Sequence, residues 1–169
     1  MSKNKEKQMN FSRIILFLII GFLFNACTPK EYVKQNSAFI MFKTPTFKYA
    51  DMGFIYENRD EIKVEIYGSG QALMTLEISE ASVCMSLLEC MSKSSFNKEV
   101  LNSMYPEDIL ENIFRGKPIM YGEGLEKNRN GFTQKIVKED KYNIDYSVLN
   151  KQIIFRDTMN AILIKIKKQ

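Results

Sequence analysis

Residues 61–78, EIKVEIYGSGQALMTLEI, decide the fold of this chain. Both halves of the stretch alternate apolar and polar residues, and the glycines of the sequence GSG at 68–70 separate the halves. Alternation with a period of two and one polar face is typical of antiparallel strands that bury a single side. The stretch therefore predicts a hairpin in an antiparallel sheet. Its inward positions are Ile62, Val64, Ile66, Met74, Leu76 and Ile78.

Further strands are expected on both sides of this hairpin. Residues 38–43 and 47–56 precede it, and in the second run Met52, Phe54 and Tyr56 share one face while Gly53 and Ile55 share the other. A short strand is expected at 83–85, whereas 87–91 is ambiguous. Residues 132–137, 142–148, 152–157 and 161–167 return to the strand pattern, and the short turns between them predict a meander.

The middle of the chain changes its period and predicts two helices. The first has its apolar residues on one face and Ser94 or Ser95 available as N-cap. The second has Pro106 at its first position, acidic residues in its first turn and Gly116 at its end. Residues 120–131 are glycine- and asparagine-rich and are expected to form a loop. The apolar positions of the first helix are Phe96, Val100, Leu101 and Met104.

Taken together, these elements predict a mainly β fold with inserted helices. We expect about nine or ten antiparallel strands by their periodicity, with the helical pair placed midway along the chain. One strongly curved, incompletely closed β-barrel with a helical lid on its concave face satisfies that order.

The N-terminus has the layout of a signal peptide. Residues 14–27, IILFLIIGFLFNAC, follow a basic leader, and their apolar run of 14–24 is about half of the roughly 20 residues that a transmembrane helix needs. Ala26 directly before Cys27 resembles a bacterial lipobox, in which the cysteine is acylated and the preceding residues are removed. We therefore expect a signal peptide at 1–26 and lipidation of Cys27. The alternative is an uncleaved N-terminal anchor with an unmodified Cys27, which gives nearly the same topology.

Residues 27–36 are expected to be the lipidated N-terminus and a tether for a domain at 37–169. The nine polar residues after the cysteine reach about 30 Å when fully extended, so the domain would stay close to its membrane. Thr28 stands where an aspartate commonly keeps a lipoprotein in the inner membrane, so the outer membrane is favoured.

Composition excludes several function classes once the leader is set aside. Residues 27–169 contain 20 basic and 19 acidic side chains, so the high pI gives no support to nucleic-acid binding. The chain has no histidine, which is the commonest general base and metal ligand. We therefore expect no enzymatic activity, no metal site and no cofactor.

Two cysteines remain after Cys27 is assigned to lipid. Cys84 and Cys90 are six residues apart and could pair in an exported compartment, although their spacing alone does not decide it. A possible disulfide between them is one reading, and two free thiols are the other.

The order of the elements resembles the LolB family of outer-membrane lipoprotein receptors. In that family a strand-turn-strand with glycines at the turn precedes a helix that ends in an aromatic residue, followed by Gly-x-Pro. Phe114, Gly116 and Pro118 match that ending, and the resemblance covers most of 37–167. The family's turn usually presents an exposed leucine, which residues 68–71 lack, and its tryptophans near the helix are absent here.

The resemblance implies a monomeric receptor that is lipid-anchored in the outer membrane and faces the periplasm. It would accept acylated lipoproteins from a LolA-like periplasmic carrier and insert them into the membrane, by binding acyl chains in an apolar cavity. The candidate acyl-binding residues are Met52, Phe54, Ile62, Val64, Ile66, Met74, Leu76, Ile78, Ile109, Ile113, Phe114, Tyr146, Ile162 and Ile164.

An ordinary packed core also explains each of these apolar residues, so the case for an acyl-binding interior rests on the set as a whole and on the resemblance. The alternative function is accordingly a structural or adaptor lipoprotein of the cell envelope, with a solid β core and another envelope protein as its partner.

Overall fold

A computed structural model describes residues 31–86 and 88–169, and Tyr32–Gln169 forms one compact unit. The predicted signal peptide, Cys27 and the first residues of the predicted tether lie outside the described residues. No helix in the described part of the chain is both long and apolar enough to cross a bilayer.

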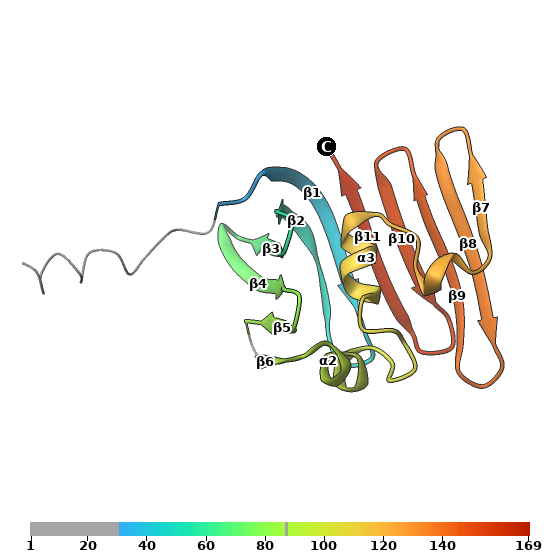
Figure 1. The fold of residues 1–169 in the computed structure, drawn as a ribbon. Coiled ribbons are helices and arrows are strands. Elements are labelled where there is room, and N and C mark those ends of the chain that lie inside the picture. The colour runs from blue at the N-terminus through green and yellow to red at the C-terminus, as the bar shows by residue number, and fades with distance from the viewer. Residues whose placement is uncertain (1–30, 87) are drawn as a thin grey trace, which may run out of the picture. The chain divides into compact units, whose positions relative to one another are not determined.

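The described strands form one open antiparallel sheet of eleven strands, in the order β6-β5-β4-β3-β2-β1-β11-β10-β9-β8-β7 (Figure 1). The sheet curves strongly, and β6 and β7 are its two edges. The predicted mainly β class is therefore confirmed. The strands are β1 (Lys34–Lys43), β2 (Lys48–Glu57), β3 (Ile62–Gly68), β4 (Gln71–Ile78), β5 (Ser82–Met85), β6 (Leu88–Ser92), β7 (Leu125–Asn128), β8 (Gly131–Lys138), β9 (Tyr142–Leu149), β10 (Gln152–Asp157) and β11 (Ile162–Lys168).

Three strand boundaries differ from the sequence-based expectation. The chain enters β1 at Lys34, so the last three residues of the predicted tether belong to the sheet. The ambiguous residues 87–91 lie largely in β6. The predicted loop at 120–131 contains β7, whose sequence LEKN has one apolar residue and thus gave no alternation to detect.

The first helix, α2 (Lys93–Val100), is shorter than expected and begins earlier. Its N-cap is Ser92, whose side chain accepts a hydrogen bond from the backbone N–H of Ser95. After the helix, the side chain of Asn102 accepts from the backbone N–H of Met104 and forms a turn. Met104 therefore lies beyond the helix, with 44% of its surface exposed.

The second helix, α3 (Ile109–Arg115), has Asp108 as N-cap, so the prediction that Pro106 is its first residue is wrong by three positions. The predicted end of the helix is confirmed, because Gly116 adopts the left-handed conformation (φ 67°) and its backbone N–H donates to the carbonyl of Ile113. A short 3₁₀ turn, η1 (Met120–Gly122), follows.

One face of the sheet, which we call the inner face, packs against these helices (Figure 1). Its residues are the alternate ones on each strand, such as Ile40 of β1, Val64 of β3 and Ile164 of β11, all fully buried. The opposite, outer face is more exposed and carries most of the polar residues of the strands, although β1, β2 and β10 also place apolar residues there. Alternation thus gives the sheet one dry and one wet side, as the sequence predicted.

The assignment of faces on β2 is a correction. Gly53 and Ile55 pair with Ile66 and Val64 and share their inner face, so Met52 and Phe54 lie on the outer face. Both faces of β2 carry apolar residues, and therefore alternation alone did not tell which one is buried. The small residue is needed inside, since a Cβ on Gly53 would lie 2.0 Å from the carbonyl oxygen of Glu65.

A disulfide joins Cys84 of β5 to Cys90 of β6. It links the edge strand of the sheet to its only neighbour in the strand order. The pairing that the sequence left open is thus present in the structure.

The close approach at Gly53 is testable by substitution. Gly53→Ala should lower the free energy of unfolding by about 3 kcal/mol, because backbone atoms rather than a flexible side chain must shift. Gly70→Ala is the control, since nothing lies within 4 Å of its Cβ and only its positive φ is strained. That strain costs about 1 kcal/mol. Urea unfolding measures both, and equal losses would contradict the argument.

Candidate functional site

The apolar interior between the sheet and α3 contains most of the predicted acyl-binding residues. Twelve of the fourteen belong to one buried cluster, and each is at most 1% exposed. Met52 and Phe54 are the exceptions, because they lie on the outer face, where Met52 is 38% exposed. The twelve are Ile62, Val64, Ile66, Met74, Leu76, Ile78, Ile109, Ile113, Phe114, Tyr146, Ile162 and Ile164.

Other buried residues of the same cluster were not among the predicted ones. Ile40, Ile55, Phe155 and Ile119 are each at most 1% exposed. Ile40 and Phe155 stand at inward positions of their strands, whereas alternation could not identify Ile55, because both faces of β2 carry apolar residues. The interior is filled by side chains in this structure, and an acyl chain could enter it only by displacing some of them.

Residues 93–124, which we call the covering segment, close this interior and contain α2, α3 and η1. The segment contributes Phe96, Ile109, Ile113, Phe114 and further apolar side chains to the core. Apolar packing is not directional, so it does not by itself fix where the segment lies. Polar side chains on the inner face supply the fixed attachment points.

Gln134 of β8 is the first attachment point, with 1% of its surface exposed. Its amide nitrogen donates to the backbone carbonyls of Ile119 (3.0 Å) and Glu123 (2.7 Å). Its amide oxygen accepts from the backbone N–H of Ile119 (2.9 Å). One buried side chain thus satisfies three backbone groups on both sides of η1, where no regular ladder could do so.

Asp157 of β10 is the second attachment point and is also 1% exposed. Its carboxylate accepts from the hydroxyl of Tyr105 in the covering segment, and from the backbone N–H of Asn143 and the amide of Asn160. Burial, reinforced by the hydrogen bond to Asp157, raises the pKa of Tyr105 above its ordinary value. Tyr105 therefore remains a neutral hydrogen-bond donor throughout the physiological range.

Tyr146 of β9 is the third attachment point. Its hydroxyl donates to the backbone carbonyl of Lys117 at 3.0 Å, just after α3 ends. Burial raises the pKa of Tyr146, which keeps this group neutral as well. The residue is thus both part of the predicted apolar lining and a tie to the covering segment.

A partly exposed ion-pair cluster attaches the other side of the segment. Glu111 of α3 accepts from Lys93 of α2 at 2.9 Å and from Arg115 at 3.0 Å. Arg115 also donates to the backbone carbonyls of Asn58 and Arg59 in the turn between β2 and β3. Burial acts to raise the pKa of Glu111, but the hydrogen bonds from Lys93 and Arg115 outweigh it and hold the pKa below its ordinary value.

These polar attachment points were not among the residues predicted from the sequence, although a signal for two of them exists. Gln134 shares its face of β8 with buried Ile136, and Asp157 shares its face of β10 with buried Phe155. A polar residue at an inward position of an alternating strand indicates a buried hydrogen-bonding role. The partner of each residue could not be inferred, because it lies in an irregular segment.

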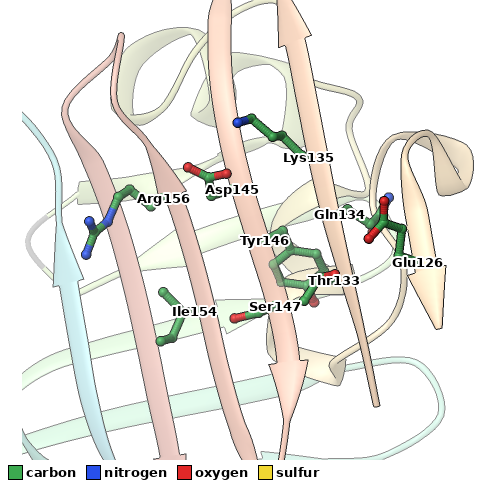
Figure 2. Close-up of a pocket in the computed structure, with 9 residues that line it drawn as sticks. All are labelled: Glu126, Thr133, Gln134, Lys135, Asp145, Tyr146, Ser147, Ile154 and Arg156. Carbon is green, nitrogen blue, oxygen red and sulfur yellow. The ribbon is translucent and has the colours of Figure 1, made fainter. Parts of the chain in front are cut away.

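A second concavity lies on the outer face, over β8, β9 and β10 (Figure 2). It has a volume of about 380 Å³. Lys135, Asp145 and Arg156 form one cross-strand row in it, because Asp145 pairs with the other two across the sheet. Thr133 and Ser147 add hydroxyl groups. Two cations beside one carboxylate suit a polar, anionic ligand group rather than a metal ion.

Within 31–86 and 88–169, no group of three or more carboxylate, cysteine or histidine residues could hold a metal ion. No protein-family model matches the chain, and no curated protein matches it either. The function is therefore argued from the geometry of the interior and of the outer face.

The role of Gln134 predicts a large loss of stability on substitution. Gln134→Leu should lower the free energy of unfolding by about 3 kcal/mol, since two buried backbone groups of Ile119 and one partly buried carbonyl of Glu123 lose their partner at once. Hydrogen exchange should also accelerate at the amide of Ile119. Gln152→Leu at the start of β10, on the outer face, serves as the matched control and should change stability by less than about 0.5 kcal/mol. Similar losses in both variants would show that Gln134 is not an attachment point.

The lowered pKa of Glu111 predicts a dependence of stability on pH. A carboxyl with a lowered folded pKa contributes stability that is fully present above its unfolded pKa of about 4.3, and loses it as the pH falls through the folded pKa. At pH 7, Glu111→Gln should therefore cost about 1 kcal/mol, and the difference from the unaltered protein should close toward pH 3. Melting temperatures over this range measure it, with exposed Glu126→Gln as control. A gap that stays constant with pH would refute the ion-pair contribution.

Proposed function

We propose that this chain is a lipid-anchored receptor that binds acyl chains, accepting lipoproteins from a LolA-like periplasmic carrier and inserting them into the outer membrane. The observation that carries the proposal is the meeting of twelve predicted acyl-binding residues between the inner face of an open sheet and the covering segment. In this proposal the covering segment acts as the lid of an incompletely closed barrel, and lipidated Cys27 is the anchor.

Energetics support an exchange between lid and acyl chain. Each buried CH₂ of an acyl chain is worth about 0.8 kcal/mol, so a sixteen-carbon chain gains on the order of 12 kcal/mol on leaving water. The buried side chains of α3 gain about 1.5–3 kcal/mol each, or roughly 6–12 kcal/mol for Ile109, Leu110, Ile113 and Phe114 together. Since the two gains are similar, an acyl chain could replace α3 without a source of chemical energy.

The construction of the lid supports the same exchange. The helices of the covering segment do not pair with any strand. The segment is attached by side chains, namely Gln134 and Asp157 of the sheet and Arg115 of α3. These contacts can break without disturbing the backbone ladder from β6 to β7. An open sheet of this kind keeps its own structure while the lid moves.

The hairpin of β3 and β4 supports a role at a membrane or cargo surface. The resemblance to LolB calls for an exposed leucine here, and the turn itself has none. Leu73, three residues after Gly70, is 50% exposed and packs directly against Gly68, where a Cβ would lie 2.4 Å from its Cδ1. An apolar side chain is therefore presented close to the expected place.

The filled interior favours a second candidate, the adaptor lipoprotein of the envelope with a solid core. The same structure offers little for an adaptor that adds strands to a partner, because the edge strands β6 and β7 are only five and four residues long. The receptor is therefore the stronger proposal, and the experiment must distinguish a movable lid from a fixed core.

Two conservative substitutions separate these functions. Residues 28–169, which contain the whole buried cluster, are titrated with a fluorescent fatty acid. Ile113→Val weakens the packing of the lid by about 1 kcal/mol and should tighten ligand binding about fivefold, because the ligand no longer competes with the full side chain. Ile164→Val removes the same group from the wall of the interior. It should lower the melting temperature similarly without tightening binding.

The signs of these two effects decide the outcome. Tighter binding by the Ile113→Val variant alone, with equal losses of stability in both variants, supports a lid that the ligand displaces. Absence of saturable binding by the folded protein would refute the receptor and favour the adaptor. Transfer of a labelled lipoprotein from a purified LolA-like carrier to vesicles is the second step, and the Leu73→Glu variant should slow it.

A further inference from the structure

Four neighbouring strands, β10, β11, β1 and β2, present a surface that the proposed receptor function does not use (Figure 1). Pairing between these strands places twelve outward residues in three rows of four, each row with one residue from each strand. The first row runs from Arg156 of β10 to Lys48 of β2, and the last row runs from Gln152 of β10 to Met52 of β2. We call this surface the basic outer face. Its cations are Lys43, Lys48, Arg156, Lys165 and Lys167.

No acidic residue stands among the twelve positions. Among the described residues, none of the five cations forms an ion pair, whereas Lys34 and Lys168 at the rim both pair with Glu57. Four of the five are exposed, and Lys165 is half-buried. Their positive charge is therefore uncompensated within the described part of the chain.

Apolar side chains alternate with these cations. The row of Lys165 also contains Ile154 and Met41, and the row of Lys167 contains Phe39 and Met52. Phe39, Met41 and Ile154 are half-buried, while Met52 is 38% exposed. The face thus offers cations on long flexible stems with apolar groups between them.

Basic and acidic residues are also concentrated in different parts of the chain. Residues 58–124 contain six basic and eleven acidic side chains, whereas 32–57 and 125–169 together contain thirteen basic and seven acidic ones. The net charge of residues 27–169, which is near zero, therefore hides a basic part, to which this face belongs, and an acidic part, which includes the covering segment. Such a dipole orients a protein on a charged surface.

We propose that the basic outer face docks on the anionic headgroups of a phospholipid bilayer. Strand β1, which crosses the middle of the face, begins seven residues after Cys27, so an anchor there holds the start of β1 within about 25 Å of the bilayer, and Phe39, the first face residue on β1, within about 40 Å. Lysine and arginine ends reach the phosphates while the apolar groups between them enter the headgroup region.

The concavity of Figure 2 continues this surface beyond β10. It shares Ile154 and Arg156 with the basic outer face and adds Lys135 of β8. Asp145 between the two cations makes this extension less positive than the face itself. A bilayer is favoured over an acidic protein partner for two reasons. The apolar groups can enter the headgroup region, and the short link to Cys27 keeps the chain close to the membrane.

The absence of tryptophan from the chain gives a direct test. Met52→Trp places a single fluorophore on the basic outer face, and Met104→Trp places one of comparable exposure beyond α2, since the parent methionines are 38% and 44% exposed respectively. The full-length chain is reconstituted in vesicles that contain brominated phosphatidylcholine, with or without about 30 mol% phosphatidylglycerol, a composition chosen on the order of natural anionic content.

Docking predicts that bromine quenches the indole of the Met52→Trp variant roughly threefold more in the anionic vesicles than in the zwitterionic ones, and that salt near about 0.5 M removes the difference. The indole of the Met104→Trp variant should be quenched weakly in both. Adding the double change Lys43→Glu and Lys165→Glu to Met52→Trp should abolish the extra quenching, while adding Lys98→Glu on α2 should leave it intact.

Quenching of the Met52→Trp variant that is independent of lipid charge, or equal to that of the Met104→Trp variant, would overturn the proposal. Quenching that the charge reversal leaves unchanged would likewise overturn it. The assay contains no acylated cargo, so its failure is distinguishable from a failure of the acyl-binding function.

Discussion

The inner face of the open sheet must be kept from water, and every other feature of the molecule depends on that constraint. Eleven strands in a curved, unclosed sheet expose a continuous apolar surface that no second sheet covers in the described part of the chain. Burial of apolar area is the dominant favourable term in folding, so the sheet needs a cover from its own sequence. The covering segment supplies it with only two short helices and one 3₁₀ turn.

A cover this short has many backbone groups without helical or strand partners, and the buried polar residues of the sheet satisfy them. Gln134 serves the backbone on both sides of η1, Tyr146 serves the end of α3, and Asp157 receives the hydroxyl of Tyr105. A buried backbone group left alone costs about as much as a lost hydrogen bond, so each contact fixes the segment in one position. The interior is thereby closed by a segment that is attached to the sheet at few points.

The sequence was informative wherever one face of an element was clearly apolar. The alternation of Ile62, Val64 and Ile66 indicated their strand and its buried side, and Gly116 indicated the end of α3. It failed on β2, where Phe54 outside and Ile55 inside are equally apolar, so the choice depended on pairing with β3. It failed as well on β7, because an edge strand needs few apolar residues.

The attachment points show a different limit. Gln134 and Asp157 stand at inward positions, which signals burial, but their partners lie in segments without periodicity. The arrangement of such segments follows from long-range contacts that no local pattern encodes. Most of the interior could therefore be predicted from alternation, with β2 as the exception, whereas the way it is closed could not.

The two proposed surfaces lie on opposite sides of the same strands. In β11, Ile164 and Ile166 face the interior while Lys165 and Lys167 face outward. In β1, Ile40 likewise faces the interior and Met41 faces outward. The backbone ladder is continuous from β6 to β7, so an acyl chain cannot pass through the sheet to a bilayer beneath it. Under the proposed function, a cargo chain that leaves the interior would go around a rim of the sheet, and the strand connections at the rims would be the places where the proposed lid, the membrane and the cargo meet.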